Sequence, residues 1–172
     1  DLYCTGVFCA VNGPDGVGRW SLMGDGIYNI DPRHPEWFGS SPAHLDAWSK
    51  IFLGWAAPLT APPGVDPGSV ILQAVESVPT PSLPAVNTNV IKLQASTSTA
   101  MQYFLLENRQ KVGYDTGLPG HGLLVWLIDD EVVNDQISSN SINNSNKRPG
   151  VRLIEADNDQ HLMILGCGGN VD

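Results

Sequence analysis

The segment that most constrains the fold reads Trp20-Ser21-Leu22-Met23-Gly24-Asp25-Gly26. It lies within residues 1–39, where Gly, Asn, Asp and Pro are frequent and apolar pieces are short. These residue types favour turns, because glycine accepts unusual backbone angles and the others bond to or restrict the local chain. We therefore predict that this part of the chain forms loops around one tight turn.

Residues 41–53 predict the clearest helix. Ser40 or Ser41 can serve as its N-cap, and Pro42 falls in the first turn, where a missing N–H costs nothing. Gly54 marks the C-terminal end. Apolar residues recur at helical spacing, and the face that we expect to be buried comprises Leu45, Trp48, Ile51 and Phe52.

After a proline-rich stretch at 57–68, the pattern changes to strands. Short runs of β-branched and aromatic residues bounded by turn signals occur at 70–78, 90–95, 102–108, 123–128 and 151–156. Residues 134–149 are mostly polar and predict a surface loop. The fold class is therefore α+β, with loops and one helix in residues 1–56 and a β-rich antiparallel region in residues 57–172.

The composition restricts the classes of function. The chain has 172 residues, enough for one domain with a core or for one domain plus a small appendage. Its net charge of −9 excludes nucleic acid as a partner, because too few cations are present to neutralise phosphates. No apolar run approaches the roughly 18 residues of a membrane span, so we expect none.

Read in order, several segments resemble the second half of the catalytic domain of M6-type (immune inhibitor A-like) secreted zinc peptidases. The first segments are Asp1-Leu2-Tyr3, Gly16-Val17-Gly18-Arg19-Trp20, residues 20–26 and residues 41–55. The later ones are Tyr103-Phe104-Leu105-Leu106-Glu107-Asn108-Arg109-Gln110, Gly113-Tyr114-Asp115, Leu118-Pro119-Gly120, residues 122–129 and residues 151–157. The resemblance covers nearly the whole chain and fades after Asp159. The family commonly has His at the position of Leu127, so no role of that histidine is expected here.

In this family the zinc-binding helix carries H-E-x-x-H-x-x-G-x-x-D, and Asp1 matches its final Asp. The resemblance therefore implies that Asp1 is the third zinc ligand, with Glu36 as an alternative carboxylate. None of the four histidines lies four residues from another, so the two histidines and the catalytic Glu of the motif are expected upstream. We expect no catalytic residue within this chain and no activity from it alone.

The resemblance also assigns the 20–26 turn. Ser21, Met23 and Gly24 match the Met-turn of the family, in which the methionine forms a hydrophobic floor beneath the metal. It further implies zinc as cofactor, protein or peptide substrates and a secreted, extracellular location. Residues 1–56 would then be the C-terminal, metzincin-like part of the catalytic domain. Residues 57–172 would be its β-rich continuation, truncated at the C-terminus.

Acidic residues at the ends of the predicted strands have two interpretations. Oxygen-rich loops can hold calcium, although no D-x-D-x-D-G loop is present. The preferred alternative is structural ion pairing, between Glu107 and Arg109 and between Glu155 and Arg152. The acids concerned are Glu107, Asp129, Glu155 and Asp157.

Two further points stay open at this stage. Cys4 and Cys9 are close enough in sequence to form a disulfide that leaves Cys167 over, but three unpaired thiols are an equal alternative. The alternative to a peptidase fragment is a secreted, non-catalytic β-rich binding module derived from such an enzyme. The sequence upstream of Asp1 separates these two hypotheses.

Overall fold

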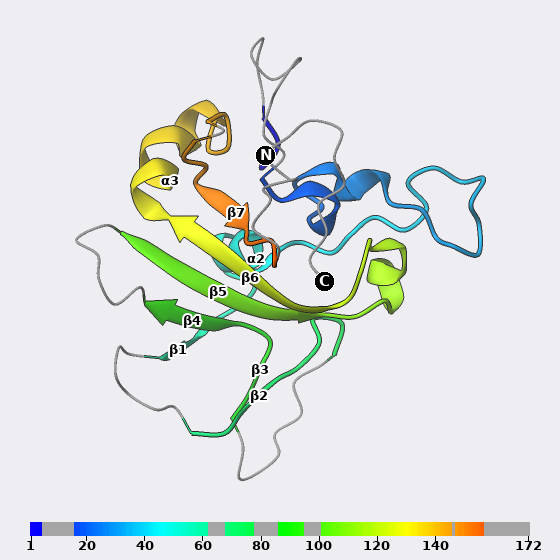
Figure 1. The fold of residues 1–172 in the computed structure, drawn as a ribbon, viewed down its shortest axis with the longest axis horizontal. Coiled ribbons are helices and arrows are strands. Elements are labelled where there is room, and N and C mark those ends of the chain that lie inside the picture. Colours follow the sequence, from blue (N-terminus) through cyan, green and yellow to red (C-terminus); the bar gives the residue numbers. More distant parts are fainter. Residues whose placement is uncertain (5–15, 62–67, 78–85, 95–100, 146, 157–172) are drawn as a thin grey trace.

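The protein was analysed as a computed structural model that describes residues 1–4, 16–61, 68–77, 86–94, 101–145 and 147–156. Its centre is a five-stranded sheet of order β1-β4-β5-β6-β7 (Figure 1). The strands are β1 (Leu59–Ala61), β4 (Ile91–Gln94), β5 (Gln102–Arg109), β6 (Gly122–Asp129) and β7 (Val151–Leu153). Two short strands, β2 (Val70–Leu72) and β3 (Val86–Thr88), pair separately.

The sheet is mixed rather than purely antiparallel. The pairs β4–β5, β5–β6 and β6–β7 are antiparallel, whereas β1 runs parallel to β4 and β2 runs parallel to β3. The prediction of an α+β fold is confirmed, but the prediction of an antiparallel region is wrong for these two pairs. A tight hairpin joins only antiparallel strands, and the long connection across residues 62–90 lets the chain return in the same direction.

The two long strands show why the core forms on one side of the sheet. In β5 every second residue is buried, namely Tyr103, Leu105, Glu107 and Arg109. In β6 the corresponding buried residues are Leu124, Trp126 and Ile128. This period of two matches the alternation of side chains along a strand. The prediction placed both strands to within about one residue, whereas the strands predicted at 70–78 and 151–156 are shorter than expected.

The predicted helix is also shorter, since α2 spans Ala47–Phe52. Asp46 is its N-cap, accepting a hydrogen bond from the Ser49 N–H at 2.8 Å. The prediction of Ser40 or Ser41 is wrong: the Ser40 hydroxyl accepts from the Asp31 N–H at 2.9 Å, and the Ser41 hydroxyl donates to the carbonyl of Tyr114 at 2.7 Å. The helix does end as predicted: Gly54 has φ of +72°, and the N–H groups of residues 54 and 55 close a Schellman motif on the last turn.

The buried face of α2 differs from the prediction at one position. Leu45 and Trp48 are buried, and Ile51 is half-buried against the core. Phe52 is 59% exposed and stacks on the outer side of the Trp48 ring, with 5.3 Å between ring centroids. The expectation that Phe52 is buried is therefore wrong. The buried residues of this short helix are Ala47, Trp48, Ser49 and Lys50, and Phe52 lies beyond them at its C-terminal end.

A second helix begins before the predicted surface loop at 134–149 and extends into it. Helix α3 (Asp130–Gln136) continues into the 3-10 turn η4 (Ile137–Ser139). Asp129 caps it through a bond from the Val132 N–H, and two acids in the first turn complement the helix dipole. Three further 3-10 turns are η1 (Gly18–Trp20), η2 (Asp25–Tyr28) and η3 (Gly113–Gly117).

One hydrophobic core joins the N-terminal residues to the sheet. Leu2, Trp20 and Trp48 belong to the same buried cluster as Leu105 and Trp126. The two predicted regions, 1–56 and 57–172, therefore share a core instead of enclosing separate ones. Within the described ranges, no helix is long and apolar enough to cross a membrane.

The different burial of Trp48 and Phe52 leads to a test. Trp48→Ala should lower the free energy of unfolding by about 3–5 kcal/mol, because the ring is enclosed and its removal leaves a cavity. Phe52→Ala, on the same helix, should cost less than about 1 kcal/mol because its ring is exposed. Urea unfolding followed by fluorescence measures both. Equal losses for the two variants would contradict this description of the core.

Candidate functional site

The 20–26 segment forms the predicted tight turn, and Ser21 organises it. The Ser21 carbonyl accepts hydrogen bonds from the N–H groups of Gly24 and Gly26 at 3.1 and 3.0 Å. Its hydroxyl accepts from the Met23 N–H at 3.1 Å and donates to Asp46 Oδ2 at 2.5 Å. A Cβ at Gly26 would collide with the carbonyl of Ser21, so only glycine fits there. The turn is thus anchored to the N-cap of α2.

The chain start lies beside this turn. The Leu2 N–H donates to the Met23 carbonyl at 2.8 Å, which brings Asp1 next to the predicted Met-turn. The Asp1 side chain is exposed, and its Oδ2 accepts from Asn140 Nδ2 at 2.7 Å. The backbone nitrogen of Asp1 donates to Asn140 Oδ1, also at 2.7 Å. Asn140 therefore holds Asp1 through two bonds.

Asn140 is the residue at this site that sequence reasoning missed. It follows η4 and adopts a left-handed conformation with φ of 52°, the single non-glycine residue with positive φ in the described ranges. Asparagine tolerates this conformation at helix ends better than most residues. A helix prediction over 130–139 would have marked Asn140 as its C-terminal residue, but not as the partner of Asp1.

The alternative ligand, Glu36, is placed differently. It lies on the exposed loop 31–38 and approaches His34, with 3.5 Å between Glu36 Oε1 and His34 Nδ1. No group of three or more His, Cys, Asp or Glu side chains able to hold a metal occurs among the described residues.

The acid Glu107 has a structural environment. Its carboxylate is fully buried and accepts from Trp126 Nε1 at 2.9 Å. The expected ion pair with Arg109 is present, with 3.2 Å between Arg109 Nη1 and Glu107 Oε1. Lys50 Nζ lies 3.5 Å from the other carboxylate oxygen. Burial lowers the pKa of Lys50, and the Glu107 charge opposes that effect only in part.

Arg109 joins Glu107 to three other segments. Its Nε and Nη2 donate to both oxygens of Asp115 at 2.6 Å. The remaining donors reach the carbonyl groups of Trp20, at 3.1 Å, and His44, at 3.4 Å. Burial alone lowers the pKa of Arg109, but the Glu107 charge and the bonds to Asp115 outweigh it and raise the pKa. Arg109 thereby supports the turn from below, at the Trp20 carbonyl.

Asp129 is likewise bound by side chains at the end of β6. It accepts from Gln102 Nε2 at 2.6 Å and from Arg148 Nε at 2.7 Å, and it caps α3. Burial by itself raises the pKa of Asp129, but these hydrogen bonds outweigh it and the pKa is lowered. Glu155 is buried just after β7, and Asp157 lies outside the described residues.

Cys4 is disulfide-bonded. Cys9 and Cys167 both lie outside the described residues. The expectation of three unpaired thiols is therefore wrong for Cys4, while the pairing with Cys9 stays a prediction.

Comparison of the chain with models of protein families, with curated proteins and with solved structures finds no match. The resemblance to M6-type peptidases therefore rests on the sequence motifs. The structure adds the spatial relation between Asp1 and the 20–26 turn, which no motif contains.

The buried ion pairs predict that removing Arg109 destabilises the fold more than removing Lys50 does. Arg109→Met should lower the free energy of unfolding by about 3–5 kcal/mol, because it leaves Asp115 buried without a counter-ion. Lys50→Met should cost less than about 2 kcal/mol, because Glu107 keeps its bonds from Arg109 and Trp126. Denaturant unfolding compares the two. A larger loss for Lys50→Met would contradict the central role given to Arg109.

The lowered pKa of Asp129 predicts a pH dependence. Its contribution to stability is fully present above the unfolded-state pKa of about 3.9 and is lost as the pH falls through the lower folded-state value. Arg148→Met should therefore lower the free energy of unfolding slightly near pH 6, since Arg148 is half-exposed, and by progressively less below about pH 4. Unfolding curves across this range test it, and a cost that grows towards acid would refute it.

Proposed function

We propose that this chain is part of a secreted zinc-dependent endopeptidase of the M6 type. Asp1 is a zinc ligand, and Ser21, Met23 and Gly24 form the Met-turn. The observation that supports the proposal best is the hydrogen bond from the Leu2 N–H to the Met23 carbonyl, 2.8 Å long. This bond brings Asp1, which matches the last residue of the zinc-binding motif, next to Met23 of the Met-turn. A zinc site with a methionine beneath it requires that proximity.

Each residue of the site has a defined task in this proposal. Asp1 offers an exposed carboxylate, and Asn140 orients it, as hydrogen-bonded partners of metal ligands do. Met23 is half-buried and packs on the hydrophobic core, so the turn is held from below. Zinc, when bound, polarises the scissile carbonyl and activates water. Calcium remains an alternative further cofactor, but Glu107 and Asp129 already bind cationic side chains.

One observation favours the second candidate, a non-catalytic binding module. Aromatic rings lie exposed on segment 27–38: Trp37 is 57% and Phe38 72% exposed. Tyr28 stacks on Phe38, and Asp31 pairs with Arg33 at 2.6 Å, so the segment is ordered before any partner arrives. Exposed aromatic groups are frequent at protein interfaces. A binding module would use this surface without zinc.

The test is a polypeptide extended upstream of Asp1 by the residues that its gene encodes there. We expect H-E-x-x-H in that extension, stoichiometric zinc and chelator-sensitive cleavage of casein. Asp1→Ala should lower kcat/KM by at least about a hundredfold, because a zinc ligand is lost. The 172-residue chain alone should retain no zinc after dialysis and cleave nothing.

The matched control is Asp25→Ala, which removes an exposed carboxylate from the same turn region. Its zinc content and kcat/KM should stay within about twofold of the unmodified extended polypeptide, because an exposed substitution rarely perturbs its surroundings. An upstream sequence without H-E-x-x-H, or equal losses for both variants, would contradict the proposal and favour the binding module.

A further inference from the structure

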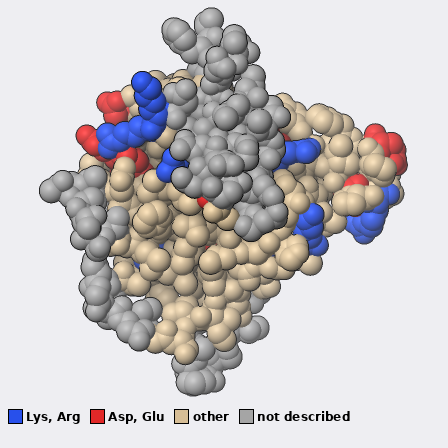
Figure 2. All heavy atoms as spheres, in the orientation of Figure 1, with Lys and Arg blue, Asp and Glu red and all other residues tan. Residues whose placement is uncertain are grey.

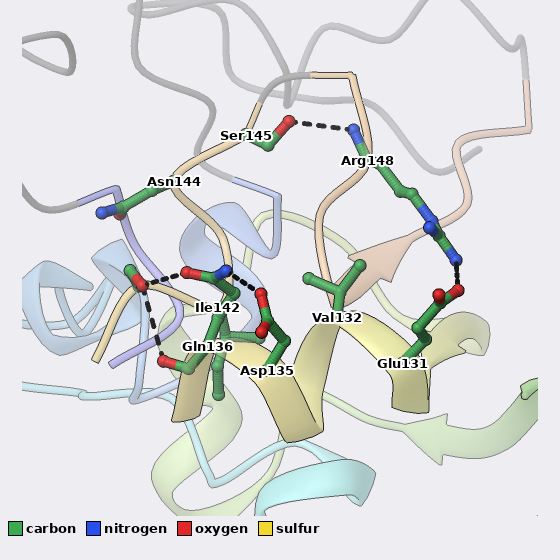
Figure 3. A pocket seen from close by; sticks show the side chains of 9 residues that line it. Glu131, Val132, Asp135, Gln136, Ile142, Asn144, Ser145 and Arg148 are labelled. Atoms are coloured by element: carbon green, nitrogen blue, oxygen red, sulfur yellow. Dashed lines mark hydrogen bonds and ion pairs between the residues drawn. The ribbon is translucent and has the colours of Figure 1, made fainter. Parts of the chain in front are cut away.

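A hollow of about 540 Å³ opens between α3 and the loop that follows it (Figure 3). Its described lining residues come from two segments, 131–136 and 141–148. The volume falls within the range of sites that bind small molecules or single side chains. Asn140, which bonds to Asp1, immediately precedes the lining residue Ser141 in the chain.

The charges around the hollow are unbalanced. Its charged lining residues are Glu131, Asp135 and Arg148, and Lys147 is not among them. Arg148 donates to Glu131 Oε2 at 2.6 Å and also to both oxygens of Asp129. One cation is therefore shared by two carboxylates, which leaves Asp135 without a cationic partner within the described residues. Figure 2 shows acidic atoms at the upper left of the molecule, where Figure 1 places α3, with basic side chains beside them.

The Asp135 carboxylate is held in place by neighbouring side chains. Ser141 Oγ donates to Gln136 Oε1 at 2.6 Å, and Gln136 Nε2 donates to Asp135 Oδ2 (Figure 3). Only the second bond reaches Asp135, at Oδ2, and a carboxylate can accept about four hydrogen bonds, so acceptor sites remain for a ligand. A carboxylate oriented in advance loses less entropy when it binds a partner.

The remaining lining residues suit an aliphatic stem. Val132 is half-buried and Ile142 is buried, so together they present an apolar floor between the two polar walls. A long basic side chain buries its methylene groups on such a surface while its charge reaches a carboxylate. A guanidinium group fits better than an ammonium group, because it bonds in a fork to a carboxylate.

We infer that this hollow is a subsite for an arginine side chain of a polypeptide substrate, with Asp135 as its counter-ion. The inference deepens the proposed peptidase function, on which the polypeptide nature of the ligand rests. Asp135 is a residue that determines specificity, and lysine binds more weakly than arginine. An uncharged side chain of the same shape gains only the contact with Val132 and Ile142.

Binding is measured on the 172-residue chain by nuclear magnetic resonance titration with N-acetyl-arginine amide. We expect shifts confined to amides of residues 131–148 and a dissociation constant of about 1 mM, typical of one ion pair with apolar contact. N-acetyl-citrulline amide, which has the same shape and no charge, should bind at least about fivefold more weakly. Raising the salt from about 0.05 M to about 0.5 M should weaken arginine binding through screening.

Two variants separate the inference from general charge effects. Asp135→Asn should weaken arginine binding by about fivefold, whereas Glu36→Gln, which removes one exposed acid from loop 31–38, should leave it unchanged. Both positions are exposed, so both variants should fold. Equal binding of arginine and citrulline amides, equal effects of both variants, or no shifts in 131–148 would overturn the inference.

Peptidase activity plays no part in this titration, so the two proposals fail in different ways. Arginine binding by the chain, together with no proteolysis by the extended polypeptide, would contradict the peptidase and keep the subsite. Proteolysis that does not distinguish arginine from citrulline in a peptide would overturn the subsite and keep the peptidase.

Discussion

The buried guanidinium of Arg109 is the interaction on which the rest of the structure depends. All five of its N–H donors are engaged, by Glu107, Asp115, and the carbonyl groups of Trp20 and His44. These partners belong to four separate parts of the chain. Because an unpaired charge in the interior is very costly, the four parts can come together in few other ways. Strand β5 therefore positions the N-terminal turn as well as the sheet.

The proposed site follows from this constraint. Above the Trp20 carbonyl, Ser21 closes the turn and bonds to Asp46, which begins α2. The turn then presents the Met23 carbonyl to Leu2 and so brings Asp1 to its place. Stability and function are coupled here, because loss of Arg109 would loosen the turn that carries the site. Asn140 holds Asp1 through two hydrogen bonds and immediately precedes Ser141, which lines the hollow beside α3.

Several features could be predicted from local patterns. The short apolar runs at 102–108 and 123–128 predict both central strands, and their side chains alternate between buried and less buried because one face of the sheet packs on the core. Gly54 gave the helix end, because a left-handed residue there is almost always glycine. The predicted helix start at Ser40 or Ser41 is wrong, because Asp46 caps the helix and the Ser41 hydroxyl bonds to Tyr114, far along the chain. Helix α3 was missed because its polar sequence carries little apolar periodicity.

By itself, the sequence determined an α+β fold and the turn at 20–26, and it supplied the motif order on which the proposed peptidase function rests, because local conformational preferences and motif order are properties of neighbouring residues. Only the tertiary structure decided that Asp1 meets Met23 and Asn140, and that Arg109 reaches the carbonyl groups of Trp20 and His44. Those relations join residues far apart in the chain. They depend on how the core packs, which no local pattern records.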